Sequence, residues 1–207
     1  QGYSSAASDV YKRQLQDWSI LCQFAYSHRI KRIQNSKDTS SFFDLVNDPL
    51  KRLANQLAAR LFLDGGMEAA SPAFAIAVPE IEGLSFQNAY PEELVRLGLI
   101  ARLGSVTGSP GELPQGCRAL LTVGGKKFPG LNLPQYPLKD SAPDLLRSLK
   151  KDGLLPENSF SEKDGVYRSA TGQIELNARR QTFKLVSPFC ELLILPGGMK
   201  SDTGGIM

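Results

Sequence analysis

The stretch QLQDWSILCQFAYSH, residues 14–28, is an apolar run that ends in side chains suited to binding a ligand. It contains the single Trp of the chain, Trp18, and the single His, His28, with Tyr26 between them. An apolar run of strand length that carries aromatics and leads into a polar segment predicts a buried strand ending at a surface. If that strand belongs to a parallel α/β barrel, Tyr26, Ser27 and His28 face the cleft in which barrel enzymes hold their active sites.

The composition is that of a globular chain with enough apolar residues for a hydrophobic core. Its 207 residues are 42% hydrophobic, which is enough for one large or two modest domains. The 24 basic and 21 acidic residues are spread along the chain, whereas nucleic-acid-binding proteins concentrate their basic residues. No apolar run approaches the ~18 residues of a membrane span. We therefore expect neither a nucleic-acid nor a membrane partner.

Signatures of cofactors and metals are weak throughout the sequence. Residues 124–127, GGKK, lack the spacing of a phosphate-binding loop, and the Gly-rich residues 107–111 do not open a helix. A single His excludes a multi-His metal site within the chain. The cysteines lie far apart, outside any CxxC spacing, and are expected to be buried small side chains: Cys22, Cys117 and Cys190. We therefore expect no cofactor and no metal, and the cellular compartment stays open.

The composition of both ends of the sequence predicts that neither is a natural end of a domain. Residues 4–14, SSAASDVYKRQ, resemble translated sequencing-adapter read-through, so residues 1–14 are left out of the fold prediction. Residues 197–207, GGMKSDTGGIM, follow a predicted strand and have the Gly-rich composition of a loop. Sheets seldom end on an unpaired strand, so we expect an internal fragment of a longer protein.

The clearest helix begins at Asp48, a good N-cap, followed by Pro49 at the first helical position. Gly65 and Gly66 end it. Its apolar residues recur at helical spacing: Leu50, Leu53, Ala54, Leu57, Ala58, Leu61 and Phe62. The preceding segment, residues 29–41, is polar and predicts a loop. In a barrel this helix would follow the last strand.

The rest of the chain predicts a mixture of α and β elements. A strand at 74–78 precedes a short helix that opens at Pro91 and gives way near Gly98. Strands at 99–106 and 118–123, an irregular segment at 124–143 and a helix from Ser141 to Gly153 complete the central region. Further strands alternate apolar and polar residues and predict an antiparallel sheet, part of a sandwich, with one solvated face: residues 166–168, 173–177, 182–186 and 191–195.

No catalytic residue can be assigned from the sequence. Ser27 and His28 would point to opposite faces of a strand, so they cannot act as a nucleophile and its base. Glycoside hydrolysis needs two carboxylates facing each other across a cleft. The close acidic pairs have simpler roles in caps, turns and helix starts: Asp44 with Asp48, Glu80 with Glu82, and Glu92 with Glu93. Trp18 and Tyr26 are either sugar-binding aromatics or core residues, because aromatic faces pack on the C–H faces of sugars.

Three segments carry a resemblance to a known family. LQDWSILCQFAYSH (15–28) and FFDLVNDPLKRLANQLAARLFLDGG (42–66) resemble the end of the (β/α)8 barrel in clan A-type glycoside hydrolases, where an aromatic-rich QDWDG-like motif precedes a helix that opens with Asp-Pro. VYRSATGQIELNARRQTFKLVSP (166–188) resembles the β-domain that follows, with its SDTGEI-like hairpin. Ser19 stands where the family often has an acid, and Ala170 replaces the acid of SDTG.

The resemblance implies an α+β fragment: the last strand and helix of a TIM barrel, followed by an antiparallel β-sandwich-like region. Residues 1–14 would lie outside the fold, 15–66 would end the barrel, 67–160 would connect, and 161–207 would form the sheet of the sandwich. The family's catalytic Glu residues lie on the fourth and seventh barrel strands, which would precede residue 14.

The expected function is therefore that of a carbohydrate-active glycoside hydrolase fragment that is inactive alone. Tyr26, Trp18 and His28 would line its sugar subsite, and carbohydrate would be its partner. The alternatives are a non-catalytic carbohydrate-binding or protein-interaction module, and a phage or surface structural protein with a β-rich tail. The sugar, the linkage and the oligomeric state stay open.

Overall fold

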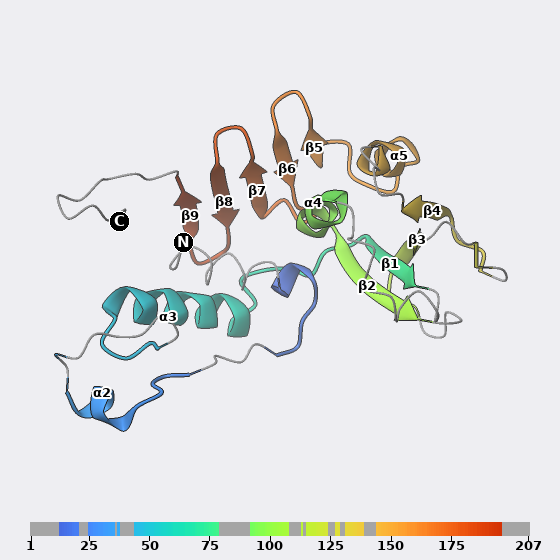
Figure 1. Cartoon of the computed structure of the whole chain (residues 1–207). Helices are drawn as coiled ribbons and strands as arrows, with labels where there is room; N and C mark the ends of the chain where they lie inside the picture. Colours follow the sequence, from blue (N-terminus) through green and yellow to red (C-terminus); the bar gives the residue numbers. More distant parts are fainter. Residues whose placement is uncertain are drawn as a thin grey trace. The chain divides into compact units, whose positions relative to one another are not determined.

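The computed structural model describes residues 13–20, 25–35, 37, 44–78, 92–107, 113, 115–123, 127–128, 131–138 and 144–195. The chain is mixed α+β, with a parallel sheet and a separate antiparallel sheet (Figure 1). It divides into two compact units, Gln1–Glu68 with Ser187–Phe189, and Ala69–Val186 with Cys190–Met207. No helix in the described ranges has the length and hydropathy needed to cross a bilayer.

The first unit is built on α3 (Pro49–Leu63), the helix that the sequence predicts. The Asp48 carboxylate accepts the backbone N–H of Lys51 at 3.0 Å, which satisfies one of the free amides at the helix start. At the other end, the Gln14 side-chain amide donates to the carbonyls of Leu61 at 2.7 Å and Phe62 at 3.0 Å. Gln14 is therefore part of the folded unit, although the sequence prediction left it out.

The predicted apolar face of α3 is only partly buried. Leu61 and Ala58 are buried, but Leu53 is 63% exposed. The periodicity located the helix correctly, whereas the width of its buried stripe was overestimated.

The strand predicted over residues 14–28 is wrong for the part of it that the structure describes. Residues 13–15 are helical and residues 16–20 and 25–28 form no strand, while residues 21–24 lie outside the described ranges. The chain reverses at Asp17, which has a φ of 62°, and Trp18 N–H donates to the Arg13 carbonyl at 2.9 Å. A strand needs a neighbour to pair its backbone groups, and the described residues of this unit supply none.

The predicted loop at 29–41 is also interrupted, by the short helix α2 (Ile30–Gln34). Residues 36 and 38–41 of that loop lie outside the described ranges.

The second unit begins with a four-stranded parallel sheet in the order β2-β1-β3-β4. Its strands are β1 (Ala73–Val78), β2 (Arg102–Thr107), β3 (Cys117–Val123) and β4 (Gln135–Leu138). The predicted strands at 74–78 and 118–123 correspond to β1 and β3. The strand predicted at 99–106 corresponds to β2, but its first two residues, 99 and 100, are helical. The fourth lies in a segment predicted to be irregular, because Pro137 argued against a strand; at a sheet edge, however, proline is tolerated.

Helix α4 (Glu92–Ile100) lies between β1 and β2 in the sequence. It passes through Gly98, where the sequence predicted that it would stop. A glycine inside a helix costs about 1 kcal/mol, while burying one large aliphatic side chain contributes about 1.5–3 kcal/mol. Leu97, Leu99 and Ile100 are all buried, so packing outweighs the local propensity.

The antiparallel sheet has the order β5-β6-β7-β8-β9. Its strands are β5 (Phe160–Ser161), β6 (Val166–Arg168), β7 (Ile174–Asn177), β8 (Thr182–Val186) and β9 (Glu191–Ile194). The predicted alternation is confirmed, since Ile174, Phe183 and Leu185 are buried while their strand neighbours are more exposed. The described residues form one antiparallel sheet here, and the expected sandwich partner is not among them.

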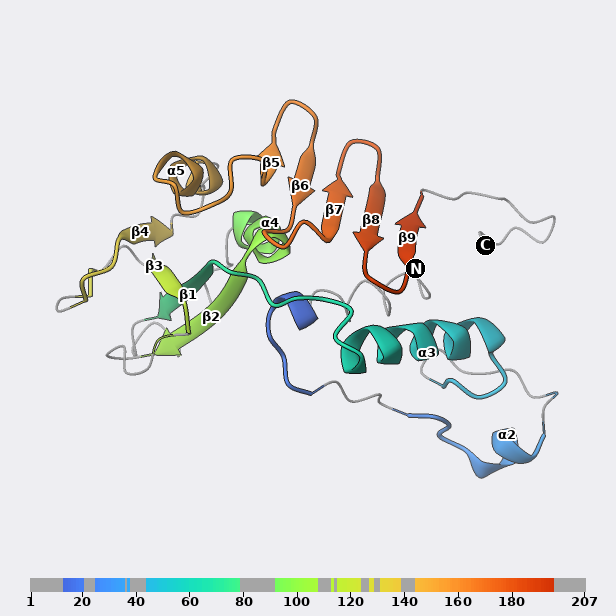
Figure 2. The ribbon, with the colours of Figure 1, turned by 180° about the vertical axis from the view of Figure 1, so that it is seen from behind.

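One hydrophobic core joins the elements of the second unit. Helix α5 (Leu145–Lys151) buries Leu145, Leu146 and Leu149, as predicted, although Asp144 rather than Ser141 directly precedes it and Ser141 lies outside the described ranges. Helix α4 contacts β2, β6 and α5 (Figure 2). The core includes residues from both sheets and both helices: Phe74, Leu97, Ile100, Leu121, Leu149, Phe160 and Tyr167.

Candidate functional site

In the first unit, the carboxylate of Asp44 is fully buried and is held by several hydrogen bonds. Its Oδ1 accepts the His28 backbone N–H at 3.1 Å and also lies against the Nδ1 of the His28 ring. Its Oδ2 accepts a hydrogen bond from the Arg32 guanidinium, and the Lys51 ammonium donates to its backbone carbonyl at 3.3 Å. We call Asp44, His28, Arg32 and Lys51 the Asp44 cluster.

Backbone hydrogen bonds hold the segment around His28 against this cluster. The Tyr26 carbonyl accepts the N–H groups of Leu45 and Val46, both at 3.0 Å. The Asn47 side-chain amide donates to the carbonyls of Arg32 at 2.9 Å and Asn35 at 3.1 Å, which satisfies carbonyls at the end of α2. Asn47 itself has a φ of 61°, a conformation that Asn adopts more readily than most residues.

The structure places the three predicted site residues outside the core. The side chain of His28 is 42% exposed, and Tyr26 and Trp18 are 50% and 53% exposed. Tyr26 and His28 belong to the segment held against the Asp44 cluster. Trp18 instead lies under the guanidinium of Arg13, whose central carbon is 5.0 Å from the ring centroid. Tyr26 and His28 therefore lie on one segment beside the Asp44 cluster, whereas Trp18 makes a separate cation–π contact with Arg13.

The cluster sets the orientation of the His28 ring. A buried carboxylate at Nδ1 favours a ring that carries a proton on that nitrogen, whether the ring is neutral or an imidazolium. The second ring nitrogen then has a defined direction, which suits hydrogen bonding to a ligand hydroxyl. Ser27 takes no part in such chemistry, because its hydroxyl donates to the Arg29 carbonyl at 2.9 Å.

The acidic pairs considered from the sequence do not form a catalytic site in the described residues. Asp44 is engaged by His28 and Arg32, and Asp48 caps α3. Glu92 opens α4, as expected for an acid at a helix start. The pair Glu80 and Glu82 lies outside the described ranges.

Sequence reasoning missed Arg32 as a functional candidate, and it considered Asp44 only as the partner of Asp48 in an acidic pair that it set aside. Asp44 stands inside the apolar run FFDLV, and a charged residue in such a run signals a buried group that requires partners. Arg32 belongs to the basic cluster with Arg29 and Lys31, the nearest source of a partner for that carboxylate.

The described residues contain no group of three or more His, Cys, Asp or Glu side chains placed to hold a metal ion. Cys117 and Cys190 are only partly buried, where the sequence predicted buried side chains; Cys22 lies outside the described ranges. Partial burial raises the pKa of the Cys117 thiol, which makes it a poor nucleophile.

Comparisons with protein families, with curated proteins and with solved structures find no match to this chain.

Proposed function

We propose that this chain binds carbohydrate through the surface that carries Tyr26 and His28. The observation that carries this proposal is the half-exposed ring of Tyr26 on the segment whose imidazole is oriented by the buried Asp44 carboxylate. A sugar packs its C–H face on an aromatic ring while its hydroxyls hydrogen-bond to polar neighbours. Tyr26 offers the aromatic face and His28 the polar group.

Trp18 supports the proposal as a second aromatic platform. Arg13 lies over one face of the indole, and the ring is still 53% exposed. Trp is a frequent anchor at binding surfaces, where its large ring supplies contact area.

The larger proposal, a glycoside hydrolase parent with a TIM-barrel end and a β-sandwich, rests on the sequence resemblance alone. For this chain we propose binding without catalysis, because the buried acids Asp44 and Asp48 are both engaged by structural partners. The purified chain is expected to release no nitrophenol from a panel of nitrophenyl glycosides. Turnover that survives repurification and disappears with Asp44→Asn would contradict this assignment.

Calorimetric titration with neutral gluco-, xylo- and galacto-oligosaccharides tests the binding proposal. Tyr26→Ala should weaken the affinity for the best ligand about tenfold, or about 1.4 kcal/mol, because it removes the stacking face. The matched control is Phe189→Ala, which removes an aromatic ring that is 57% exposed in the same unit and should leave affinity unchanged. The proposal fails if no oligosaccharide binds, or if both variants lose affinity equally.

A further inference from the structure

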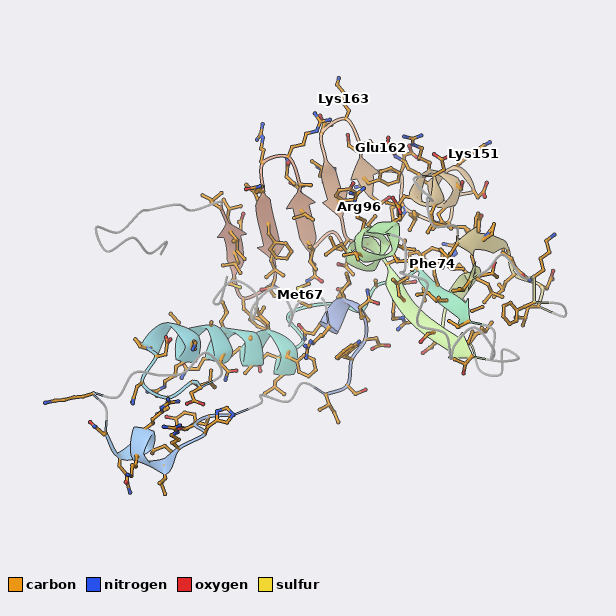
Figure 3. The ribbon with its side chains drawn as sticks, in the orientation of Figure 1. Met67, Phe74, Arg96, Lys151, Glu162 and Lys163 are labelled. Carbon is orange, nitrogen blue, oxygen red and sulfur yellow. The ribbon has the colours of Figure 1, made fainter. Side chains whose placement is uncertain are left out.

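Strand β9 forms one edge of the antiparallel sheet, and among the described strands only β8 pairs with it (Figure 1). An edge strand presents backbone N–H and C=O groups with which another strand can pair, so proteins usually shorten it or place lysine or proline on it. At the opposite edge, β5 has only two residues and leads into the turn that contains Glu162 and Lys163 (Figure 3). Strand β9 has four residues, ELLI, with neither lysine nor proline among them.

One face of the sheet is charged up to β8 and becomes apolar at β9. Arg168 lies opposite Glu175 and donates to its carboxylate at 2.8 Å, and Glu175 lies opposite Lys184. The next residue of this row, in β9, is Leu193, which is 55% exposed. Lys184 instead pairs diagonally with Glu191, at 2.6 Å. The row of charges therefore ends in an exposed leucine, at the position where a solvated edge strand usually carries a charge.

The other face of the sheet is apolar through β9, but its burial decreases there. Phe183 and Leu185 in β8 are buried, whereas Ile194 and Leu192, which lie opposite them in β9, are only partly buried. A strand that covers β9 must therefore be apolar on both of its faces, because it continues this apolar face on one side and meets Leu193 on the other.

We propose that β9 pairs antiparallel with the β9 of a second copy of this chain, about a two-fold axis at Leu193. Strand β9 is itself apolar on both faces, and a two-fold contact brings the same surface of each copy together. Residues opposite each other in an antiparallel pair point to the same face of the sheet. Leu193 would therefore pack on Leu193 of the second copy, and Leu192 on its Ile194.

The charges favour this arrangement over a parallel pair or a charged partner strand. Glu191 is the one ionisable residue of β9, and Lys184 already neutralises it. In the antiparallel pair, the two Glu191 carboxylates lie four positions apart, or about 13 Å along the strands, which exceeds the Debye length of about 8 Å at physiological ionic strength. A parallel pair would place these two carboxylates side by side. The proposed contact does not depend on the carbohydrate proposal.

Sedimentation equilibrium of the full chain tests this proposal. One short strand from each copy gives a smaller interface than the ~1,600 Å² of a standard complex, so we expect a reversible dimer with a Kd of about 100 µM. Leu193→Lys should weaken association at least tenfold, because two ammonium groups then face each other across the axis. Leu193→Glu should have the same effect through two carboxylates. The matched control is Val95→Lys, which changes an exposed valine of α4 in the same unit and should leave association unchanged.

An equimolar mixture of the Leu193→Lys and Leu193→Glu chains should associate again, because opposite charges then meet at the axis. This recovery requires that residue 193 lies opposite itself, so loss of folding in either variant cannot imitate it. A parent chain that stays monomeric at about five times the expected Kd, a mixture that does not associate, or an equal loss with Val95→Lys would each overturn the proposal.

Discussion

Replacing Asp44 by Asn should destabilise the first unit of the chain selectively. The substitution keeps the shape of the side chain and removes its charge. Asp44 is fully buried and accepts from His28 through Oδ1 and from Arg32 through Oδ2. The Asn amide has one oxygen, so it can accept from only one of these groups, and its NH2 group then faces the other donor.

The expected cost follows from the exposure of those two partners. Breaking a fully buried ion pair costs about 3–5 kcal/mol. The side chains of Arg32 and His28 are 21% and 42% exposed, so water recovers part of that cost. We expect a loss of about 2 kcal/mol in the free energy of unfolding, which exceeds the effect of an ordinary surface substitution.

The assay is urea unfolding followed by the fluorescence of Trp18, the single Trp of the chain, which lies in the same unit. With an m-value of about 1 kcal/mol/M for a unit of this size, the midpoint should fall by about 2 M. The matched control is Asp64→Asn, which breaks the exposed pair with Arg60 and should cost less than about 1 kcal/mol. Equal midpoints for the two variants would refute the structural role of the Asp44 cluster.

Two further predictions concern the second unit. Burial, aided by the hydrogen bond to Asp152, raises the pKa of the Tyr136 phenol from 10.0 to about 12. The stabilisation from this group is present below pH 10 and is lost as pH rises toward 12; absorbance at 295 nm should show one late-titrating tyrosine that Asp152→Asn moves to lower pH, and an unchanged titration would contradict the assignment. Gly165→Ala should cost about 2 kcal/mol in thermal unfolding, because Gly165 has a φ of 65° and a Cβ there would lie 2.7 Å from the Arg179 side chain. Gly172→Ala has a similar φ of 73° with nothing within 4 Å, so it should cost only about 1 kcal/mol, and equal losses would show that the contact with Arg179 is unimportant.

The elements that could be predicted from the sequence are those whose signals are local. Asp48 and Pro49 mark the start of α3 because capping and a preset φ act within one helical turn. The strand at 166–168 and the strand at 182–186 have the predicted bounds, because alternation of apolar and polar residues reports directly on a sheet with one buried face.

The misplaced elements depend on partners that are distant in the sequence. Residues 14–28 have the composition of a strand, but a strand forms only where another can pair with it, and this segment instead turns at Asp17. The strand β4 forms in a Pro-containing segment because β3 offers it an edge. Helix α4 continues through Gly98 because Ile100 enters the shared core.

The sequence by itself determined the mixed α+β class, the capped helix α3, and the antiparallel sheet at the C-terminal side of the chain, because each follows from propensity and periodicity over a few residues. Only the tertiary structure decided which charges meet. Asp44 and His28 are 16 positions apart, and Arg147 and Glu162 are 15 apart, so their pairing depends on chain paths that no short pattern encodes. Electrostatic energy falls with distance in space, not in sequence. The oriented imidazole on the segment of Tyr26 is for this reason visible only in the folded chain.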